Sequence, residues 1–376
     1  MRSIQMVDLK QQYLHIKSEV DAAIHEVLDS CAFINGKPVQ DFAQELAQYL
    51  GTKHVVPCAN GTDALQISLM ALGLQPGDEV ITPSFTYVAT TEVIALLRLK
   101  PVFVEVDPRT FCIDPDAMAK AITPKTKAIV PVHLYGQASA METIMEIARK
   151  HRLPVVEDNA QAIGCDYIFK DGSTKKTGTI GTIGCTSFFP SKNLGAYGDA
   201  GAIFTDDDAL AEQLKMIANH GQRARYYHDL VGCNSRLDTI QAAVLRIKLR
   251  RLDEYAAARQ KAADYYNKAF AGHSKITTHV TATYCNHVFH QYTLVLNDVD
   301  RNGLNEYLAK KQVPSMIYYP VPAHRQKMFS TFGGMAYQLA LTDWLSERVI
   351  SLPMHTELDE EQLKYITSQV LEFVNH

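Results

Sequence analysis

Short apolar runs alternate with helical patterns between residues 53 and 158, and this alternation limits the fold more than any other feature of the sequence. The expected strands are His54–Pro57, Glu79–Thr82, Pro101–Val106, Lys127–Val132 and Leu153–Glu157. The expected helices between them are Asp63–Leu72, Val88–Leu97, Pro115–Ile122 and Met141–Lys150. Strands that are joined through helices form a mostly parallel sheet with helices on both faces. The pattern therefore predicts an α/β domain.

Two more strand-like runs and a long helix follow this region. The runs are Thr186–Phe189 and Ala202–Thr205, and the helix is expected to begin near Ser235 and to continue to about Tyr266. The later elements are expected at Gln291–Leu296, Asn302–Lys311 and Asp359–Phe373. We therefore expect two domains: a large α/β domain over residues 1–250, which includes the N-terminal segment, and a small α+β domain over residues 251–376.

Composition and charge exclude several classes of protein. A net charge of −4 and 21% charged residues give no electrostatic reason to expect nucleic acid or an anionic membrane as partner. The chain has neither an N-terminal apolar run typical of a signal peptide nor one of the roughly 20 residues that a membrane span needs. Its seven cysteines form no CxxC pair and its fourteen histidines no HExxH motif, so we expect reduced cytoplasmic thiols and no metal.

Three segments that follow predicted strands carry the candidate chemistry, because ligands bind at the carboxyl ends of parallel strands. In the first, Asn60-Gly61-Thr62-Asp63, glycine allows close backbone approach, and the free N–H groups at the start of a helix favour a phosphate. The alternative is a plain turn with a helix N-cap. The second, Glu157-Asp158-Asn159-Ala160-Gln161, places the Asp158 carboxylate where it can pair with a protonated ring nitrogen. The alternative for Asp158 is also a helix N-cap.

The third segment, Ser187–Gly201, holds Lys192 between a strand and a glycine-rich loop. A lysine in such a loop does not belong to a helix face, so packing does not explain it. Partial burial would lower its pKa, and its free amine could then form imines. The glycines do not form a dinucleotide-binding loop, because Gly195-x-x-Gly198-x-x-Gly201 differs from GxGxxG and precedes a strand.

Together these segments resemble the DegT/DnrJ/EryC1/StrS family of sugar aminotransferases, a branch of the fold-type-I enzymes that use pyridoxal 5'-phosphate (PLP). The resemblance covers nearly the whole chain. Its motifs are, in order, Val7–Lys10, Phe33–Gly36, Asn60–Leu65, Pro83–Thr90, Glu157–Gln161, Ser187–Gly201, His220–Gln222, Asn234–Asp238 and Ser351–Met354. It implies the aspartate-aminotransferase-like fold, with a large, mostly parallel α/β domain and a small α+β domain.

The resemblance also implies roles for individual residues around the cofactor ring. Lys192 would hold PLP as a Schiff base and later carry a proton between substrate and cofactor. Asp158 would pair with the pyridine nitrogen, and Gln161 would hydrogen-bond the 3-hydroxyl group. Phe85 would stack on the ring, with ordinary core packing as the alternative.

Other residues are implied to hold the phosphate and the substrates. The backbone of Gly61 and Thr62 and the Ser187 hydroxyl would bind the phosphate. Asn234 would reach it from the neighbouring subunit of a homodimer, or would cap the following helix. Arg236 would bind the sugar nucleotide, or would be a solvated helix charge. His324 lies in a loop that the family places near the active site, and a structural role is its alternative.

A lysine at position 192 favours amino transfer, because related sugar 3-dehydratases carry histidine there. The resemblance implies that L-glutamate donates its amino group and that a nucleotide-linked keto-sugar accepts it. The lysine loop and the run Cys58–Gln66 resemble those of enzymes that aminate C3 of UDP- or dTDP-linked hexoses for cell-surface polysaccharides such as O-antigen. Amination at C4 of a 4-keto-6-deoxyhexose is the alternative. A non-enzymatic regulatory role is a remote one, since only Arg246–Arg251 is strongly basic.

Overall fold

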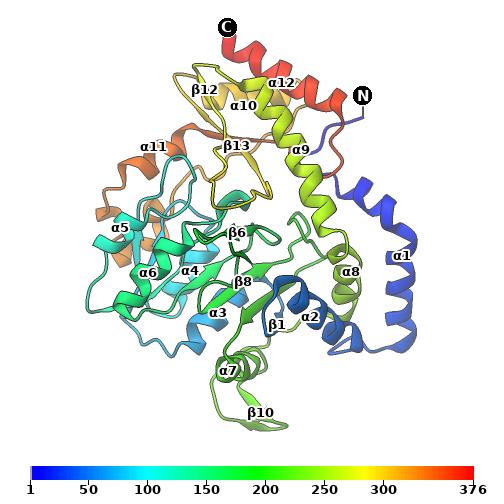
Figure 1. Ribbon diagram of the computed structural model, residues 1–376, viewed down its shortest axis with the longest axis vertical. Helices are drawn as coiled ribbons and strands as arrows, with labels where there is room; N and C mark the ends of the chain where they lie inside the picture. The colour runs from blue at the N-terminus through cyan, green and yellow to red at the C-terminus, as the bar shows by residue number, and fades with distance from the viewer. Residues whose placement is uncertain (1) are drawn as a thin grey trace.

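A computed structural model describes residues 2–376, and its centre is a sheet made of two parts (Figure 1). One part has the strand order β1-β9-β8-β5 and the other the order β3-β2-β4. Isolated parallel bridges, Ile129 with Val155 and Val132 with Asp158, join β4 to β5. All neighbouring strands are parallel except that β9 is antiparallel to β1 and β8. The strands are β1 (His54–Cys58), β2 (Glu79–Pro83), β3 (Lys100–Val104), β4 (Thr126–Ile129), β5 (Val156–Asp158), β8 (Ile183–Ser187) and β9 (Gly201–Thr205). The expected mostly parallel sheet is confirmed.

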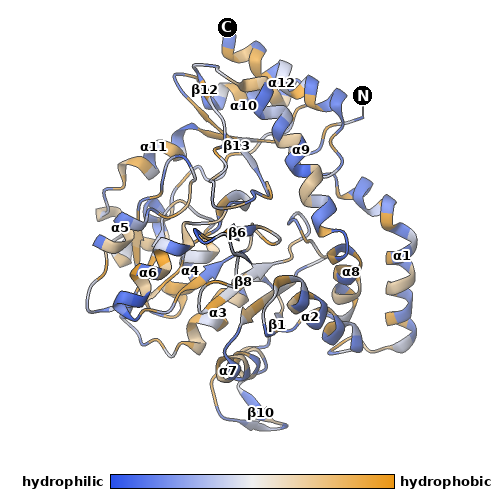
Figure 2. Ribbon diagram, viewed as in Figure 1, coloured by the Kyte–Doolittle hydropathy of each residue, from blue (hydrophilic) through white to orange (hydrophobic). Residues whose placement is uncertain are grey.

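Helices cover both faces of this sheet because consecutive strand residues point to opposite sides. Val80 packs into one core with residues of α3 and α7, whereas its neighbour Ile81 packs into another with residues of α6. The covering helices are α3 (Gly61–Ala71), α4 (Ala89–Leu96), α5 (Pro115–Lys120), α6 (Met141–His151) and α7 (Asp208–Ala218). The helices expected in this region are therefore confirmed to within a few residues. Figure 2 shows the apolar residues gathered on the central strands and the helices that cover them.

The expected long helix from Ser235 to Tyr266 is wrong in two respects. It consists of two helices, α8 (Thr239–Leu249) and α9 (Leu252–Phe270), with a break between them. It also starts later than expected, because Ser235 is held by other loops: its N–H donates to the Ala218 carbonyl and its hydroxyl accepts from the N–H of Ala59. Helix α8 packs against the N-terminal helices α1 (Leu9–Ser30) and α2 (Lys37–Leu50).

The C-terminal part has its own antiparallel sheet and hydrophobic core. Its strands are β12 (Ile276–Thr277), β13 (Tyr292–Leu296) and β14 (Val349–Leu352), and its helices are α10 (Arg301–Lys310), α11 (Ala340–Arg348) and α12 (Glu360–Asn375). Buried residues from α9, β13, α10 and α12, such as Tyr266, Leu294, Leu308 and Ile366, form one cluster. Ile4 of the N-terminal segment also packs into this cluster. The domain boundary at residue 250 stays a prediction.

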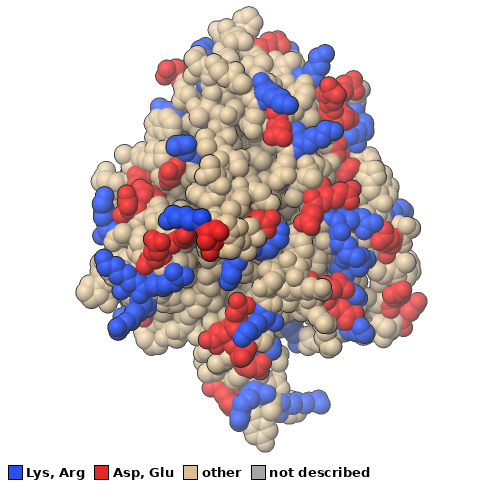
Figure 3. Space-filling view, in the orientation of Figure 1, with Lys and Arg blue, Asp and Glu red and all other residues tan. Residues whose placement is uncertain are grey.

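Two small hairpins lie outside these layers, β6 (Asp166–Ile168) with β7 (Thr174–Lys176) and β10 (Gln222–Ala224) with β11 (Tyr227–His228). The second hairpin projects beyond α7 at the bottom of Figure 1. Acidic and basic side chains are interspersed over the face seen in Figure 3. Within residues 2–376, no helix combines the length and the apolar character that crossing a bilayer would require.

Candidate active site

The loop that carries Lys192 joins β8 to β9 and is fixed by hydrogen bonds from several elements. The N–H of Lys192 donates to the Phe189 carbonyl at 2.8 Å, and Asn193 Nδ2 donates to the Val288 carbonyl at 2.8 Å. From α8, Lys248 Nζ donates to the Gly195 carbonyl at 2.6 Å. The loop is therefore an ordered support that presents Lys192 at the end of β8.

The amine of Lys192 is poised to react near neutral pH. Burial disfavours its charged form and lowers its pKa to about 8, although the negative charge of Asp158 acts in the opposite direction. A lysine of ordinary pKa is almost wholly protonated at pH 7 and cannot attack a carbonyl group. The structure thus provides the free amine that the sequence predicts.

Asp158 lies at the end of β5, with its carboxylate held by two donors. Thr90 Oγ1 donates to Oδ2 at 2.7 Å, and the N–H of Ala160 donates to Oδ1 at 3.1 Å. The residue is only 5% exposed, and it is close enough to Lys192 for the two charges to interact. The helix N-cap alternative is wrong, because a turn and not a helix follows β5. A fixed, buried carboxylate here can partner a cationic ring nitrogen.

The start of α3 and the end of β8 meet in a narrow contact. A Cβ atom placed on Gly61 would lie 2.6 Å from the Ser187 Cβ, so only glycine fits. Asn60 caps the helix, since its side-chain oxygen accepts from the N–H of Asp63 at 2.8 Å. The first N–H groups of a helix, here those of Gly61 and Thr62, have no partner within the helix. Asn60 can therefore cap the helix while the N–H groups of Gly61 and Thr62 stay free to bind an anion. The Ser187 hydroxyl lies beside these groups.

Gln161 is buried between two aromatic residues. Its Oε1 accepts from the N–H of Tyr135 at 2.7 Å, and its Nε2 donates to the Tyr319 hydroxyl at 3.0 Å. These bonds fix the amide in one orientation. The predicted bond to a cofactor hydroxyl stays a prediction.

Phe85 is fully buried, which agrees with the alternative that it packs in the core. Its ring contacts those of Phe111, Tyr135 and Tyr319, with centroids 6.1–6.4 Å apart. Two residues later, Tyr87 is 55% exposed, and its ring centroid lies 6.1 Å from that of Tyr319. Tyr87 is thus an aromatic face in the same loop that remains open to a ligand, although its role was not foreseen from the sequence.

Asn234 and Arg236 lie between the β10–β11 hairpin and α8. Asn234 is exposed and pairs through a single bridge with Asn219, and the N-cap of α8 is Asp238. The N-cap alternative for Asn234 is therefore wrong. Arg236 precedes the helix, so it is not a solvated helix charge, and it lines a cavity of about 280 Å³. The predicted roles of both residues in substrate or phosphate binding stay predictions.

His324 has a structural environment. Its side chain is fully buried in a short 3-10 helix (Ala323–Arg325). The Nδ1 atom lies 2.7 Å from the Ser84 hydroxyl, and Nε2 lies 3.2 Å from Asp343 Oδ1. Burial lowers its pKa, against the effect of Asp343. This histidine joins the loop after β2 to α11, which favours the structural alternative.

His290 and Gln291, which the sequence did not single out, line a cavity of about 360 Å³ together with Ser191. His290 is close enough to Lys192 for the lysine charge to lower the histidine pKa. A lone His-Gln pair has no distinctive spacing, so only the fold could reveal this position.

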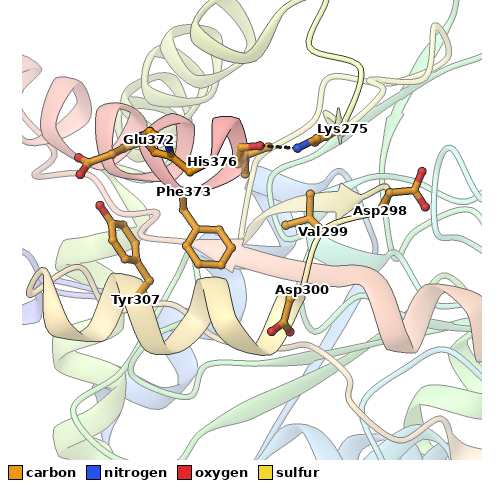
Figure 4. Close-up of a pocket in the computed structure, with 9 residues that line it drawn as sticks. Lys275, Asp298, Val299, Asp300, Tyr307, Glu372, Phe373 and His376 are labelled. Atoms are coloured by element: carbon orange, nitrogen blue, oxygen red, sulfur yellow. Dashed lines mark hydrogen bonds between the residues drawn. The ribbon is translucent and has the colours of Figure 1, made fainter.

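Another cavity, of about 350 Å³, lies between α10, α12 and the turn at residues 298–300 (Figure 4). Figure 4 shows the rings of Tyr307 and Phe373 next to each other in its wall, with centroids 5.3 Å apart, and Lys275 bonded to the end of α12. None of the predicted site residues lines it. Among residues 2–376, no group of three or more His, Cys, Asp or Glu side chains is arranged to hold a metal ion.

Comparison with known proteins gives matches over nearly the whole chain. The DegT/DnrJ/EryC1/StrS aminotransferase family matches residues 14–371. A "pleiotropic regulatory protein" of Geobacillus stearothermophilus is 44% identical over 100% of this chain and 99% of its own length. The UDP-2-acetamido-2-deoxy-3-oxo-D-glucuronate aminotransferase of Pseudomonas aeruginosa is 46% identical over 96% of this chain and 98% of its own. The crystal structure of DesV from S. venezuelae has a TM-score of 0.94, with 38% identity and full coverage of both chains.

The residues at or just after the carboxyl ends of β1, β5 and β8 have the chemistry that PLP requires. They supply a reactive amine at Lys192, a buried carboxylate at Asp158 and a cradle between Gly61 and Ser187 that even one added methyl group would fill. Solved relatives of this family include a structure with pyridoxamine phosphate bound. The chain belongs to the DegT/DnrJ/EryC1/StrS aminotransferase family and is a PLP-dependent enzyme that acts on nucleotide-linked sugars.

Proposed function

We propose that this enzyme transfers the amino group of L-glutamate to C3 of a UDP- or dTDP-linked 3-keto-hexose in the cytoplasm. In the overall reaction the sugar carbonyl becomes a primary amine, and the C–N bond of glutamate is replaced by the carbonyl of 2-oxoglutarate. The observation that carries amino transfer is the Lys192 amine, with its pKa lowered to about 8, beside the buried Asp158. The similarity to the P. aeruginosa enzyme, whose name specifies a 3-oxo sugar, supports position 3.

The residues of this chain would divide the work as follows. PLP supplies an electron-accepting ring when it is bound. Asp158 holds a proton on the ring nitrogen, because its carboxylate is fixed by Thr90 and by the N–H of Ala160. Lys192 Nζ would take the proton from the donor carbon and deliver it to the cofactor carbon, and would carry a proton the opposite way in the second half-reaction. The Gly61 and Thr62 N–H groups and the Ser187 hydroxyl bind the phosphate.

The aromatic and amide residues would orient the ring between them. Tyr87 offers the exposed face that Phe85 lacks, so we assign ring stacking to Tyr87. Gln161, held by Tyr135 and Tyr319, turns its remaining amide hydrogen toward the 3-hydroxyl group.

A homodimer would complete the site. Asn234 is exposed beside the hairpin, whose Tyr226 is 77% exposed and whose β strands project beyond α7 (Figure 1). A side chain on such an arm can reach a second subunit. We therefore propose that Asn234 binds the phosphate of the partner's site and that Arg236 binds the sugar nucleotide.

The experiment that tests position 3 offers a panel of keto-sugar nucleotides to the enzyme in its pyridoxamine form. We expect 3-keto hexoses to consume that form and 4-keto-6-deoxyhexoses to leave it unchanged. If only the 4-keto substrates react, the alternative C4 reaction replaces our proposal, while the amino transfer itself stands.

The name of the Geobacillus relative favours examination of a second function, that of a regulatory protein. Electrophoretic mobility of DNA fragments with and without the enzyme tests DNA binding. We expect no shift, because the chain has a net charge of −4 and basic and acidic residues are mixed on the face seen in Figure 3. A sequence-specific shift that persists in Lys192→Ala would establish a regulatory role separate from catalysis.

A further inference from the structure

Lys248 is a buried lysine beside the lysine loop, the residues 188–200 between β8 and β9. It lies on α8 and is only 1% exposed. Its Nζ donates to the Gly195 carbonyl at 2.6 Å and lies 5.1 Å from the centre of the Tyr197 ring, over its face. Within residues 2–376 the bond to Gly195 is the only hydrogen bond of this side chain, and no carboxylate acts on it. Lys248 is thus directed at the loop that carries Lys192.

A lysine at this position is costly for the fold. Burial and the charge of Arg259 lower the pKa of Lys248 to about 7. The buried amine must therefore either keep its charge in an apolar surrounding or give up its proton, and both cost free energy. Its neighbours on α8, Val244 and Leu245, are apolar and fully buried. Methionine has a similar shape and could pack beside them without the cost of a buried amine. Packing alone does not explain the lysine.

Gly195, which accepts the bond from Lys248, lies where the lysine loop closes on itself. A Cβ atom on Gly195 would lie 2.2 Å from the Pro190 carbonyl oxygen, so the backbone packs directly against a residue just before Lys192. The next N–H group, that of Ala196, donates to the Phe188 carbonyl at 2.8 Å. Lys192 therefore stands in a turn whose two ends are joined. A bond that holds the Gly195 carbonyl holds this whole turn.

Helix α8 holds the loop at a second point on the same face. Gln241 precedes Lys248 by seven residues, which is about two helical turns, so the two side chains lie on one side of the helix. Gln241 Oε1 accepts from the N–H of Tyr197 at 2.8 Å, and its Nε2 donates to the Tyr197 carbonyl at 3.4 Å. Since α8 is itself packed against α1 and α2, it is a firm support for the turn that carries Lys192.

We propose that Lys248 is a positioning residue, which fixes Lys192 for proton transfer through its hydrogen bond to the Gly195 carbonyl. The proposal rests on the role of Lys192 proposed above. Lys248 acts through position and not through its charge, because burial and Asp158 account for the shifted pKa of Lys192. The Lys248 amine can donate in its charged and in its neutral form. Without this bond the turn would loosen and admit water, which would raise the pKa of Lys192 toward its ordinary value and misplace its amine.

The first test measures how fast the cofactor-free enzyme acquires its visible band with PLP between pH 6 and 10. In the wild type the midpoint of this rate should lie near pH 8. In Lys248→Met it should rise by about one pH unit or more, so that the rate at pH 7 falls about tenfold or more. Lys261→Met, which changes an exposed lysine of α9, is the matched control and should keep the wild-type midpoint. An unchanged midpoint in Lys248→Met would overturn the proposal.

The second test separates positioning from stability in the holoenzyme. At saturating PLP, kcat of Lys248→Met should fall about tenfold or more, while the KM values of both substrates change less than about twofold. A loss of unfolding free energy in urea with the wild-type kcat and midpoint would show a purely structural role and overturn the proposal.

If Lys248→Met does not fold, Lys248→Gln decides in its place. Its side chain is polar but too short by one atom to reach the Gly195 carbonyl, so its midpoint should shift in the same direction. A wild-type midpoint in this variant would also overturn the proposal. Absence of the visible band in the wild type would contradict the role of Lys192 instead.

Discussion

The cofactor-free enzyme should combine with PLP much faster at neutral pH than an ordinary lysine does. Only the unprotonated amine attacks the aldehyde, so the rate follows the fraction of free amine. With a pKa of about 8, Lys192 is about one-tenth unprotonated at pH 7. A lysine with the ordinary pKa of 10.5 has about one amine in 3,000 free at that pH. The advantage at pH 7 is therefore roughly 300-fold.

The assay mixes cofactor-free enzyme with PLP in a stopped-flow spectrophotometer and follows the visible band from pH 6 to 10. The rate should rise with pH through a midpoint near pH 8, which burial of Lys192 sets, and level off above about pH 9. In Asp158→Asn the midpoint should fall further, since the Asp158 charge raises the lysine pKa. Free Nα-acetyl-lysine serves as the control and should continue to accelerate through pH 10. A wild-type rate that also keeps rising through pH 10 would refute the reasoning.

Five substitutions test separate parts of the site and its surroundings. Gly61→Ala should weaken PLP binding at least tenfold by equilibrium dialysis, because its new Cβ would lie 2.6 Å from the neighbouring side chain. Asp158→Asn should lower kcat about 100-fold or more at saturating PLP, since amide replaces the charge opposite the ring nitrogen. Phe85→Ala should lower the free energy of unfolding, measured in urea, by about 3–5 kcal/mol. Tyr87→Ala should leave the free energy of unfolding unchanged and weaken PLP binding. Glu157→Gln should lower the free energy of unfolding at pH 7 by roughly 3 kcal/mol, because an amide cannot accept all the buried hydrogen bonds that the Glu157 carboxylate accepts, among them those from the N–H groups of Gly178 and Gly181.

The Glu157 prediction also has a defined pH window. Burial raises the pKa of this carboxyl, but the hydrogen bond from His133 and those from the backbone of Gly178 and Gly181 outweigh burial, so its pKa is lowered overall. The stabilisation is therefore present above the unfolded pKa, about 4.5, and is lost as the pH falls below it. Urea unfolding of wild type and variant from pH 7 down to about pH 2 should show a constant difference in free energy above about pH 4.5 and convergence only below it, as the pH falls through the lowered pKa of the folded state. A difference that stays constant down to the lowest pH would contradict this account.

The sequence predicted the elements that carry the site because local patterns determine them. Alternating apolar runs mark the strands to within a few residues, and Asn60 marks the start of α3 because it supplies the cap. Lys192, Asp158 and Gly61 stand at strand or helix ends, where a parallel sheet brings its ligands together. Their meeting therefore follows from the fold class alone.

Other features depend on tertiary contacts that no local pattern contains. Ser235 looks helical, but its bonds to Ala59 and Ala218 delay α8. Phe85 and Tyr87 are equivalent as aromatic residues in one loop, and only packing shows that one is enclosed and the other open. His290 is nearly 100 residues from Lys192 in sequence, and the hydrogen bond from Asn193 Nδ2 to the Val288 carbonyl ties its segment to the lysine loop.

The absorption spectrum of the purified enzyme with PLP tests the central claim most directly. The account predicts a yellow protein whose visible band is bleached by L-glutamate, is restored by 2-oxoglutarate and is absent in Lys192→Ala. A wild-type protein that acquires no band, or a Lys192→Ala variant whose band responds to glutamate like the wild type, would contradict the assignment of Lys192.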